Sequence, residues 1–441
     1  MAVSLARLIA FAPAVAALIA AENHASRWWP LRFPRSPLDF DRDSTRLFTL
    51  LTTPARGLLA PIGSPNTQLV EHTRSGQLAN EPEKNRTTGV FNLVIEDDGH
   101  RRSLRVITKF QSGRGMPLYM QAIRAVAEHG IAREIEFYRR LASVVPVEVP
   151  RPLFADSVTV LNRVCLVLEY VDGDNQPDWR GCSLAAIQVL LANAARLNAS
   201  LFDRLTDPAA AWIPARTGLE FADYVTTFIG KHEPWYRRIW TALQVYFERS
   251  PVTLVHGDCR PGNMLFRGVN IDIGGGNEDA ESEWPATPPP ASAAVVMCDW
   301  EAVNVAPLLW DFTYCTIIGL RVADRRAWQT RLLQQFLGHL RDRGVDEKHL
   351  DSARAVVETQ LLAIVLAYVS LVVYENGLWA GQGNTSEDLA TWTRRVMDAA
   401  SGGDAAAITG ALHVPVEDIR RLQEYLHAKL SPLKSSQSER L

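Results

Sequence analysis

Residues 252–266 read VTLVHGDCRPGNMLF and place a charged octapeptide, HGDCRPGN (256–263), between two apolar runs. Gly, Asp, Pro and Asn are the residues that ordinary turns use, so a simple surface turn is one interpretation. A second apolar run, AVVMC (294–298), is followed directly by Asp299. If the two segments pair as strands, Asp258, Asn263 and Asp299 meet at one edge, and the octapeptide has a chemical role.

The three side chains have the chemistry of a phosphoryl-transfer site. Aspartate and asparagine oxygens are hard ligands that suit Mg²⁺, which keeps several waters and takes further oxygens from nucleotide phosphates. A carboxylate that is not bound to the metal can accept a proton from a hydroxyl group. Phosphoryl transfer is accelerated almost entirely by positioning of the reactants and neutralisation of charge, so a base and two metal ligands are enough to suggest this reaction.

Length and composition describe an ordinary soluble protein of two or three compact units. The 441 residues are 47% apolar and 22% charged. A net charge of −3 gives no general polycation, which argues against nucleic acid as a partner. The five cysteines are widely spaced and form neither a CxxC pair nor a zinc pattern, so we expect reduced thiols in a cytosolic protein.

The chain changes character near residue 172. FNLVIEDDGHRRSLRVITKF (91–110) predicts two strands joined by a turn at Asp97-Asp98-Gly99. A helix is expected over 131–145, followed by two β-like runs at 157–162 and 163–171. Helical segments are then expected at 183–203, 219–248, 323–343, 348–376, 386–400 and 415–429. The prediction is an α+β protein with a small β-rich part and a larger helical part.

Two segments of the helical part call for separate interpretation. LLAIVLAYVSLVVY (361–374) is too short for a membrane span and is expected to be the central buried helix. The insert 267–293 combines a run of three glycines, five acids and three consecutive prolines, a composition that predicts a mobile surface loop. Its GGG is not a phosphate loop, because no Lys or Ser/Thr follows at the required spacing.

The N-terminal segment leaves alternatives open. Its apolar run, 8–21, is shorter than the roughly 20 residues that span a bilayer. A secretory signal fits the length, and a helix that contacts a membrane surface or a partner through residues 1–30 fits the Trp28-Trp29-Pro30 cluster. Chemistry that needs cytosolic ATP argues against export. We expect a cytoplasmic protein, with peripheral membrane contact as the open alternative.

HGDCRPGN resembles the catalytic loop of the kinase-like phosphotransferases, the group of aminoglycoside phosphotransferases, choline kinases and ecdysteroid kinase-like proteins. Asp258 and Asn263 are separated by five positions, as in the protein-kinase pattern H-R-D-x-x-x-x-N. The resemblance implies a two-lobed, protein-kinase-like fold. It makes Asp258 the catalytic base, Asn263 and Asp299 the Mg²⁺ ligands, and Arg260 a cation that offsets charge on the γ-phosphate.

The same resemblance assigns roles in the β-rich part. Lys109 ends the run LRVITK as the β3 lysine of these kinases does, and Glu134 in AREIEFYRRL is its implied partner. Glu136, two residues further along the helix, is the poorer candidate. LVLEYVDG (166–173) resembles the hinge, where backbone groups near Glu169 and Val171 would hold adenine.

His256 is implied to brace the catalytic loop, and Asp311 to be structural. The resemblance covers roughly residues 66–400, and its weakest point is the loop that should cover the nucleotide. No GxGxxG is present, and Gly76 and Gly89 are the nearest substitutes. We therefore expect four parts, namely an N-terminal apolar segment and Pro/Arg-rich linker (1–65), a nucleotide-binding lobe (66–172), a catalytic lobe (173–430) and a polar tail (431–441). Residues 22–66 are expected to form an extended linker that contains one short helix at 43–52.

The predicted function is an ATP- and Mg²⁺-dependent kinase that phosphorylates a hydroxyl of a small molecule. Four tryptophans of the helical part could form the wall of an apolar acceptor pocket, namely Trp212, Trp235, Trp240 and Trp379. Together with the scattered acids they favour a neutral or lipophilic acceptor, because polycationic acceptors need clustered acids. The alternative is a non-catalytic, kinase-like nucleotide-binding protein with a regulatory or membrane-associated partner role, which only the altered glycine loop favours.

Overall fold

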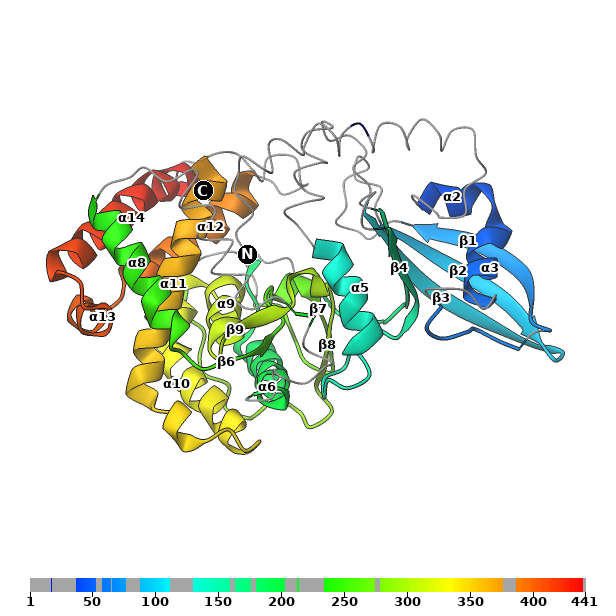
Figure 1. The fold of residues 1–441 in the computed structure, drawn as a ribbon, viewed down its shortest axis with the longest axis horizontal. Helices are drawn as coiled ribbons and strands as arrows, with labels where there is room; N and C mark the ends of the chain where they lie inside the picture. Colours follow the sequence, from blue (N-terminus) through cyan, green and yellow to red (C-terminus); the bar gives the residue numbers. More distant parts are fainter. Residues whose placement is uncertain are drawn as a thin grey trace. The chain divides into compact units, whose positions relative to one another are not determined.

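The computed structural model in Figure 1 describes the following residues: 17, 37–52, 58–64, 66–76, 88–111, 130–158, 163–175, 180–202, 212–213, 234–273, 278–375 and 386–438. The chain divides into two compact units. Unit 1 comprises Met1–Val144 and Val149–Asp172, and unit 2 comprises Val145–Glu148 and Gly173–Leu441. The sequence analysis put the change of character near residue 172. The apolar run 8–21 lies almost wholly outside the described residues.

Unit 1 contains a five-stranded antiparallel sheet in the order β1-β2-β3-β5-β4 (Figure 1). The strands are β1 (Gln68–Gly76), β2 (Thr88–Asp97), β3 (His100–Gln111), β4 (Pro152–Val158) and β5 (Arg163–Glu169). The turn expected between β2 and β3 is confirmed, since Asp97 pairs with His100 across Asp98 and Gly99. Both turn residues have positive φ, which a tight hairpin requires.

Alternation along β3 decides which way the Lys109 side chain points. Successive side chains of a strand lie on opposite faces of the sheet. Phe110 belongs to the buried cluster on one face, together with Cys165 and Val167 of β5. Lys109 pairs with Leu166 and therefore lies on the other face.

Two short helices complete the buried cluster, and they correct the prediction of an extended linker over residues 22–66. α2 (Pro37–Arg42) and α3 (Ser44–Thr52) place Phe40, Leu47 and Leu51, each 0% exposed, against the sheet. Phe40 contacts Phe91 edge-on, with ring centroids 5.8 Å apart. The short helix expected at 43–52 is confirmed, but it is part of the core and not of a linker.

On the remaining face, α5 (Gly130–Arg140) packs against β4 and β5. It confirms the helix expected at 131–145, although it ends five residues earlier. The strand expected at 157–162 is wrong by five residues, because β4 begins at Pro152. A proline is tolerated as the first residue of a strand, because its missing N–H removes no hydrogen bond from the middle of the ladder.

Unit 2 is built around two short antiparallel ladders. β6 (Val252–Val255) pairs with β9 (Asn304–Pro307), and β7 (Met264–Arg267) pairs with β8 (Ala294–Met297). The expected pairing of residues 252–266 with the run 294–298 is confirmed by β7 and β8, and β6 pairs in addition with β9 further along the chain. This pairing brings residues 256–263 and residues 298–303 together, because each segment connects one ladder to the other.

Helices make up most of the rest of unit 2 (Figure 1). They are α6 (Leu184–Ser200), α8 (Pro234–Glu248), α9 (Trp310–Gly319), α10 (Val322–Arg341), α11 (Ser352–Glu375), α12 (Ser386–Ser401), α13 (Ala405–Leu412) and α14 (Val416–Ser438). Neither α9 nor α13 was predicted. α14 continues to Ser438 and so replaces most of the polar tail expected at 431–441.

The apolar helix of unit 2 is part of the core. Among the described residues, Ser352–Ser370 alone is long and apolar enough to cross a membrane, and 61% of that window is buried within the protein. The positions from Leu361 to Tyr368 are all buried. The central buried helix expected at 361–374 is thus confirmed over its described side chains.

The insert 267–293 is the clearest error of the sequence analysis. Residues 278–284, called the docked segment below, bind α10 and α12. Glu278 forms a 2.6 Å ion pair with Arg395, and the two side chains are 2% and 1% exposed. Ser282 donates its backbone N–H to Asp324, and the Trp284 ring contacts both the Trp328 ring and the Arg331 guanidinium. Charged and aromatic contacts hold a segment that is poor in aliphatic residues.

Candidate active site

In unit 1, Lys109 and Glu134 form an ion pair. The Lys109 Nζ lies 2.8 Å from Glu134 Oε2, and the Glu134 side chain is 1% exposed. Glu136 instead binds Arg139 and Arg140 of its own helix. The helical period explains the choice, because residues two apart on a helix point in different directions. A buried carboxylate fixes the lysine cation at the end of β3.

The segment resembling a hinge follows β5 in unit 1. The Glu169 N–H is donated to Arg151 O and the Tyr170 N–H to Arg105 O. The Arg105 guanidinium lies 3.6 Å from the Tyr170 ring centroid, which stiffens the segment further. Glu169 and Val171 are thus at the end of an ordered strand, where a backbone carbonyl and N–H could meet a planar base.

In unit 2, residues 256–263 fold into a compact loop around Asp258. Asn263 Nδ2 donates to Asp258 Oδ2 at 2.7 Å and to the Asp258 backbone oxygen at 3.1 Å. Arg260 Nε lies 3.0 Å from Oδ1 and 3.1 Å from Oδ2 of the same carboxylate. Pro261–Asn263 forms a single 3₁₀ turn that sets this spacing. The predicted base and its neighbours are therefore brought together.

Asp311, in the first turn of α9, connects this loop to that helix. Its carboxylate accepts the backbone N–H of His256 at 2.9 Å and that of Gly257 at 3.0 Å. Asn198 of α6 donates to it at 3.1 Å. Burial raises the pKa of Asp311, and the charge of His256 and these donors counteract part of that rise. The carboxylate touches backbone groups of the loop, which is the bracing geometry of a structural residue.

Gly257 and His256 fix the direction in which the loop leaves β6. Gly257 has φ +86°, and a Cβ there would lie 2.0 Å from the Ala302 backbone oxygen. His256 is fully buried, its ring packs at a tilt against Trp300 with the ring centroids 4.5 Å apart, and its Nε2 lies 2.9 Å from Cys298 O. The histidine thus connects the loop to the residues that precede and follow Asp299.

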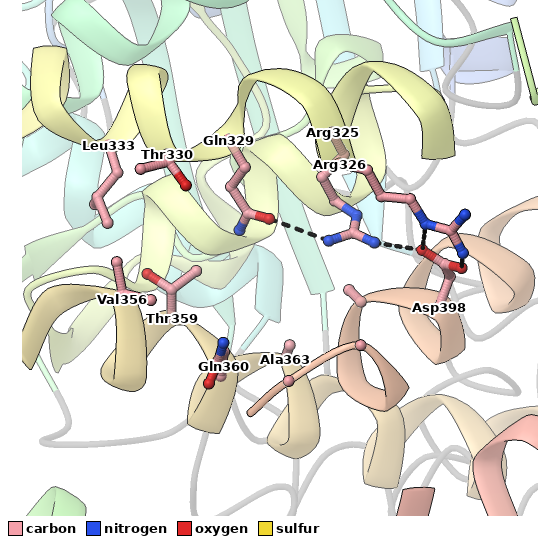
Figure 2. Close-up of a pocket in the computed structure, with 13 residues that line it drawn as sticks. Arg325, Arg326, Gln329, Thr330, Leu333, Val356, Thr359, Gln360, Ala363 and Asp398 are labelled. Carbon is pink, nitrogen blue, oxygen red and sulfur yellow. Dashed lines mark hydrogen bonds and ion pairs between the residues drawn. The ribbon is translucent and has the colours of Figure 1, made fainter. Parts of the chain in front are cut away.

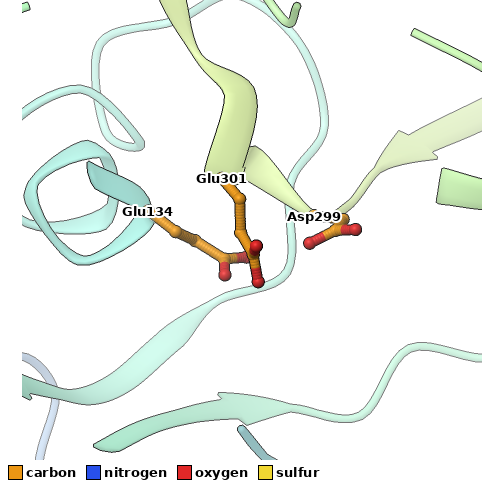
Figure 3. A group of neighbouring side chains, drawn as sticks. All are labelled: Glu134, Asp299 and Glu301. Atoms are coloured by element: carbon orange, nitrogen blue, oxygen red, sulfur yellow. The ribbon is translucent and has the colours of Figure 1, made fainter. Parts of the chain in front are cut away.

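Asp299 and Glu301 offer two carboxylates for a cation. Their nearest oxygens lie within 4.8 Å of each other. Figure 3 shows both side chains extending from the turn after β8; Glu134, drawn in the same figure, belongs to unit 1. Asp299 adopts the left-handed conformation, with φ 63°. Strain of this kind is typical of functional positions.

The donor set fits Mg²⁺. Because Asn263 gives its amide hydrogens to Asp258, its Oδ1 is the atom left to face a cation. The Asn263 backbone oxygen accepts the N–H of Cys298 at 3.0 Å, which keeps Asn263 beside the Asp299 turn. One amide oxygen and two carboxylates are hard ligands in the small number that Mg²⁺ takes from protein.

Sequence reasoning missed two residues of this site. Asn175 donates its side-chain N–H groups to the backbone oxygens of Pro261, Gly262 and Met264, and so holds the outside of the loop. No motif marks it, because it lies 86 residues before Pro261. Glu301 was visible in the Asp299-Trp300-Glu301 triplet, and the alternation of polar residues around Trp300 could have indicated it.

Two further predictions concern the tryptophans of the acceptor pocket and the loop over the nucleotide. Trp240 is buried against Tyr368, with ring centroids 5.5 Å apart, so it belongs to the core and not to the wall of an acceptor pocket. The loop expected to cover the nucleotide, between Gly76 and Gly89, lies mostly outside the described residues, and Trp379 lies outside them as well.

Comparison with known proteins places part of the chain in a family of enzymes by similarity. Residues 98–274 match the model of the phosphotransferase enzyme family known as APH. The match contains Lys109, Glu134, Asp258 and Asn263. The resemblance read from the motifs is confirmed, and so is the two-lobed α+β fold class expected with it.

Solved structures similar to this chain include an amicoumacin kinase in complex with AMP-PNP, Ca²⁺ and Ami. It is 13% identical, with 82% of this chain and 93% of that chain covered and a TM-score of 0.46. The GDP complex of aminoglycoside 2′-phosphotransferase-IIIa is 14% identical, with coverages of 77% and 95% and a TM-score of 0.42. No curated protein matched the sequence. Likeness at this level says nothing about substrate.

Proposed function

We propose that this protein is an ATP- and Mg²⁺-dependent kinase that transfers the γ-phosphate to a hydroxyl group of a small molecule. The match of residues 98–274 supports a nucleotide-using phosphotransferase of small molecules. ATP, Mg²⁺ and a neutral or lipophilic alcohol acceptor are the finer parts of the proposal. The hydrogen-bonded set of Asp258, Asn263 and Arg260 supports it most directly.

In this proposal Asp258 accepts the proton of the attacking hydroxyl. A general base must keep its carboxylate oriented while the acceptor enters, and Asn263 does this through its hydrogen bonds. Arg260 lies at the same carboxylate and would turn towards the transferred phosphoryl group as negative charge gathers there. Asp311 keeps the loop in place without touching the substrate.

Unit 1 would hold the nucleotide. Lys109, with its cation fixed by Glu134, would contact the α- and β-phosphates, and the backbone near Glu169 and Val171 would bind adenine. Asn263, Asp299 and Glu301 would hold Mg²⁺. When bound, the metal would neutralise charge on the β- and γ-phosphates and orient them.

Calorimetric titration with Mg·ATP tests the nucleotide part of the proposal. The wild type should bind Mg·ATP, and Asp299→Ala should weaken binding in Mg²⁺ much more than binding of ATP in EDTA. Glu136→Gln is the control, since Glu136 binds only helix neighbours among the contacts described above and should leave binding unchanged. A wild-type protein that gives no binding heat with Mg·ATP would refute the proposal.

A further inference from the structure

A cavity of about 560 Å³ lies within unit 2, apart from the residues of the candidate active site. Figure 2 shows that side chains from α10 and α11 face one another across it and that Asp398 of α12 closes one end. The lining residues are Arg325, Arg326, Gln329, Thr330, Leu333, Val356, Thr359, Gln360, Ala363, Asp398, Ala399, Gly402 and Gly403. Volumes of 300–1,000 Å³ are typical of small-molecule sites.

The cavity wall has an excess of positive charge. Arg325 and Arg326 both bind the Asp398 carboxylate, which is the only acid among the described residues that line the cavity. Arg325 is only 8% exposed, whereas the Arg326 side chain is 62% exposed. Two guanidinium groups therefore share one carboxylate, which leaves this wall of the cavity with a net positive charge, carried by the buried Arg325 and the solvent-exposed Arg326 together.

Polar atoms at this wall also lack partners. Arg325 donates to Gln329 and Asp398, but its Nε has no hydrogen-bond acceptor among the residues that the structure describes. The same holds for Gln360 Oε1 on the opposite helix, which has no donor in the described part of the chain. Buried polar groups in native proteins are almost always satisfied, so these two atoms need partners from water or from a molecule that enters the cavity.

The pKa of Arg325 is consistent with a bound anion beside it. Burial lowers its pKa, and Asp398, which raises it, only partly compensates. An anion next to the guanidinium would restore the balance, since it offsets the desolvation of the cation. Arginine suits such a role because its planar fork binds carboxylate and phosphate groups through paired hydrogen bonds.

We propose that this cavity is a binding site for a compact organic anion, with a carboxylate or phosphate group at Arg325 and Arg326 and hydroxyl groups towards Gln360 and Thr359. A hydroxyl group can donate to Gln360 Oε1, and an oxyanion can accept from Arg325 Nε. Thr359 gives its own hydroxyl proton to Ala355 O, so its oxygen can accept. The site is distinct from the proposed catalytic centre and does not depend on the kinase activity.

Thermal unfolding of the full-length protein with three probes tests the proposal. The probes are inorganic phosphate, glycerol 3-phosphate and citrate, with glycerol as the uncharged control and sodium chloride at matched ionic strength. The charged probes should raise the Tm by about 2 °C or more at saturation, because a ligand that binds the folded state stabilises it. A Tm increase with citrate alone would show that the site prefers a carboxylate, and an increase with the two phosphates alone would show that it prefers a phosphate group.

Variants locate the binding. Arg326→Gln removes the excess charge while Arg325 keeps its carboxylate partner, so probe affinity should fall about tenfold. Arg420→Gln is the matched control, since its side chain is 61% exposed and lies on α14, and it should leave affinity unchanged. Asp299→Ala in the catalytic region should also leave it unchanged.

Three results would overturn the proposal. The first is no Tm shift beyond that of matched sodium chloride. The second is an equal loss of probe affinity in Arg326→Gln and Arg420→Gln. The third is loss of the shift in Asp299→Ala alone, which would assign the anion to the proposed nucleotide site.

Discussion

Glu278→Gln should destabilise unit 2 strongly although it lies in an insert with the composition of a loose loop. The substitution removes a carboxylate that binds Arg395 at 2.6 Å and also accepts the Val322 N–H at 3.1 Å. Removing one partner of a buried ion pair leaves the other charge uncompensated and costs about 3–5 kcal/mol. Unit 2 spans roughly 270 residues, for which about 4 kcal/mol corresponds to a Tm decrease of about 7 °C.

The neighbouring residue provides a matched control. Asp279 also pairs with an α12 arginine, Arg394, but the Asp279 side chain is 72% exposed. Exposed pairs contribute at most about 1 kcal/mol, so Asp279→Asn should lower the Tm by no more than about 2 °C. Scanning calorimetry measures both variants, and hydrogen exchange should show faster exchange over 278–284 in Glu278→Gln. Equal, small shifts in the two variants would refute a docked segment.

Three further predictions concern single side chains. Lys109→Met should lower kcat/KM for ATP about a hundredfold in a coupled assay, because it removes a cation that would stabilise the charge developing on the phosphates. Glu136→Gln should change kcat/KM less than twofold. Equal losses in the two variants would contradict a role for the Lys109–Glu134 ion pair. Burial raises the pKa of Glu358 from 4.5 to about 7, so the folded protein binds the carboxyl proton of Glu358 more tightly than the unfolded chain does. The folded state therefore loses stability as the pH rises from 4.5 to 7. Glu358→Gln should therefore raise the free energy of unfolding by about 3 kcal/mol at pH 8 and change it little at pH 4, and denaturant titrations showing the same gain at both would contradict this. Gly257→Ala should lower kcat about a hundredfold while Mg·ATP binding survives, since the loop must shift to clear the Ala302 oxygen; unchanged kcat would show that the loop tolerates the shift.

Local spacing made much of the site predictable. Asp258, Asn263 and Asp299 lie at the ends of short apolar runs, and strand pairing alone brings such ends together. Lys109 on β3 and Glu134 on α5 required the family resemblance, because nothing in a strand-end lysine or a helical glutamate identifies a partner 25 residues away. Alternation and helical period then explain why these two residues meet.

The errors have a common cause. Composition predicts whether a segment can bury apolar surface, and the docked segment buries charged and aromatic groups instead. Its main anchor, Arg395, lies 117 residues later in the chain, so no local pattern reveals it. The linker prediction failed in the same way, because Phe40 and Leu47 find their apolar partners on strands that come much later. Asn175 was missed because its contacts are to backbone atoms.

Transfer of label from γ-³²P-ATP to a panel of small hydroxyl compounds tests the proposed kinase activity most directly. The wild type should label at least one neutral or lipophilic alcohol in a Mg²⁺-dependent reaction. Asp258→Asn should reduce that labelling by at least a hundredfold while it still binds Mg·ATP. Tight Mg·ATP binding with no labelled product across the panel, or equal labelling by Asp258→Asn, would contradict the account.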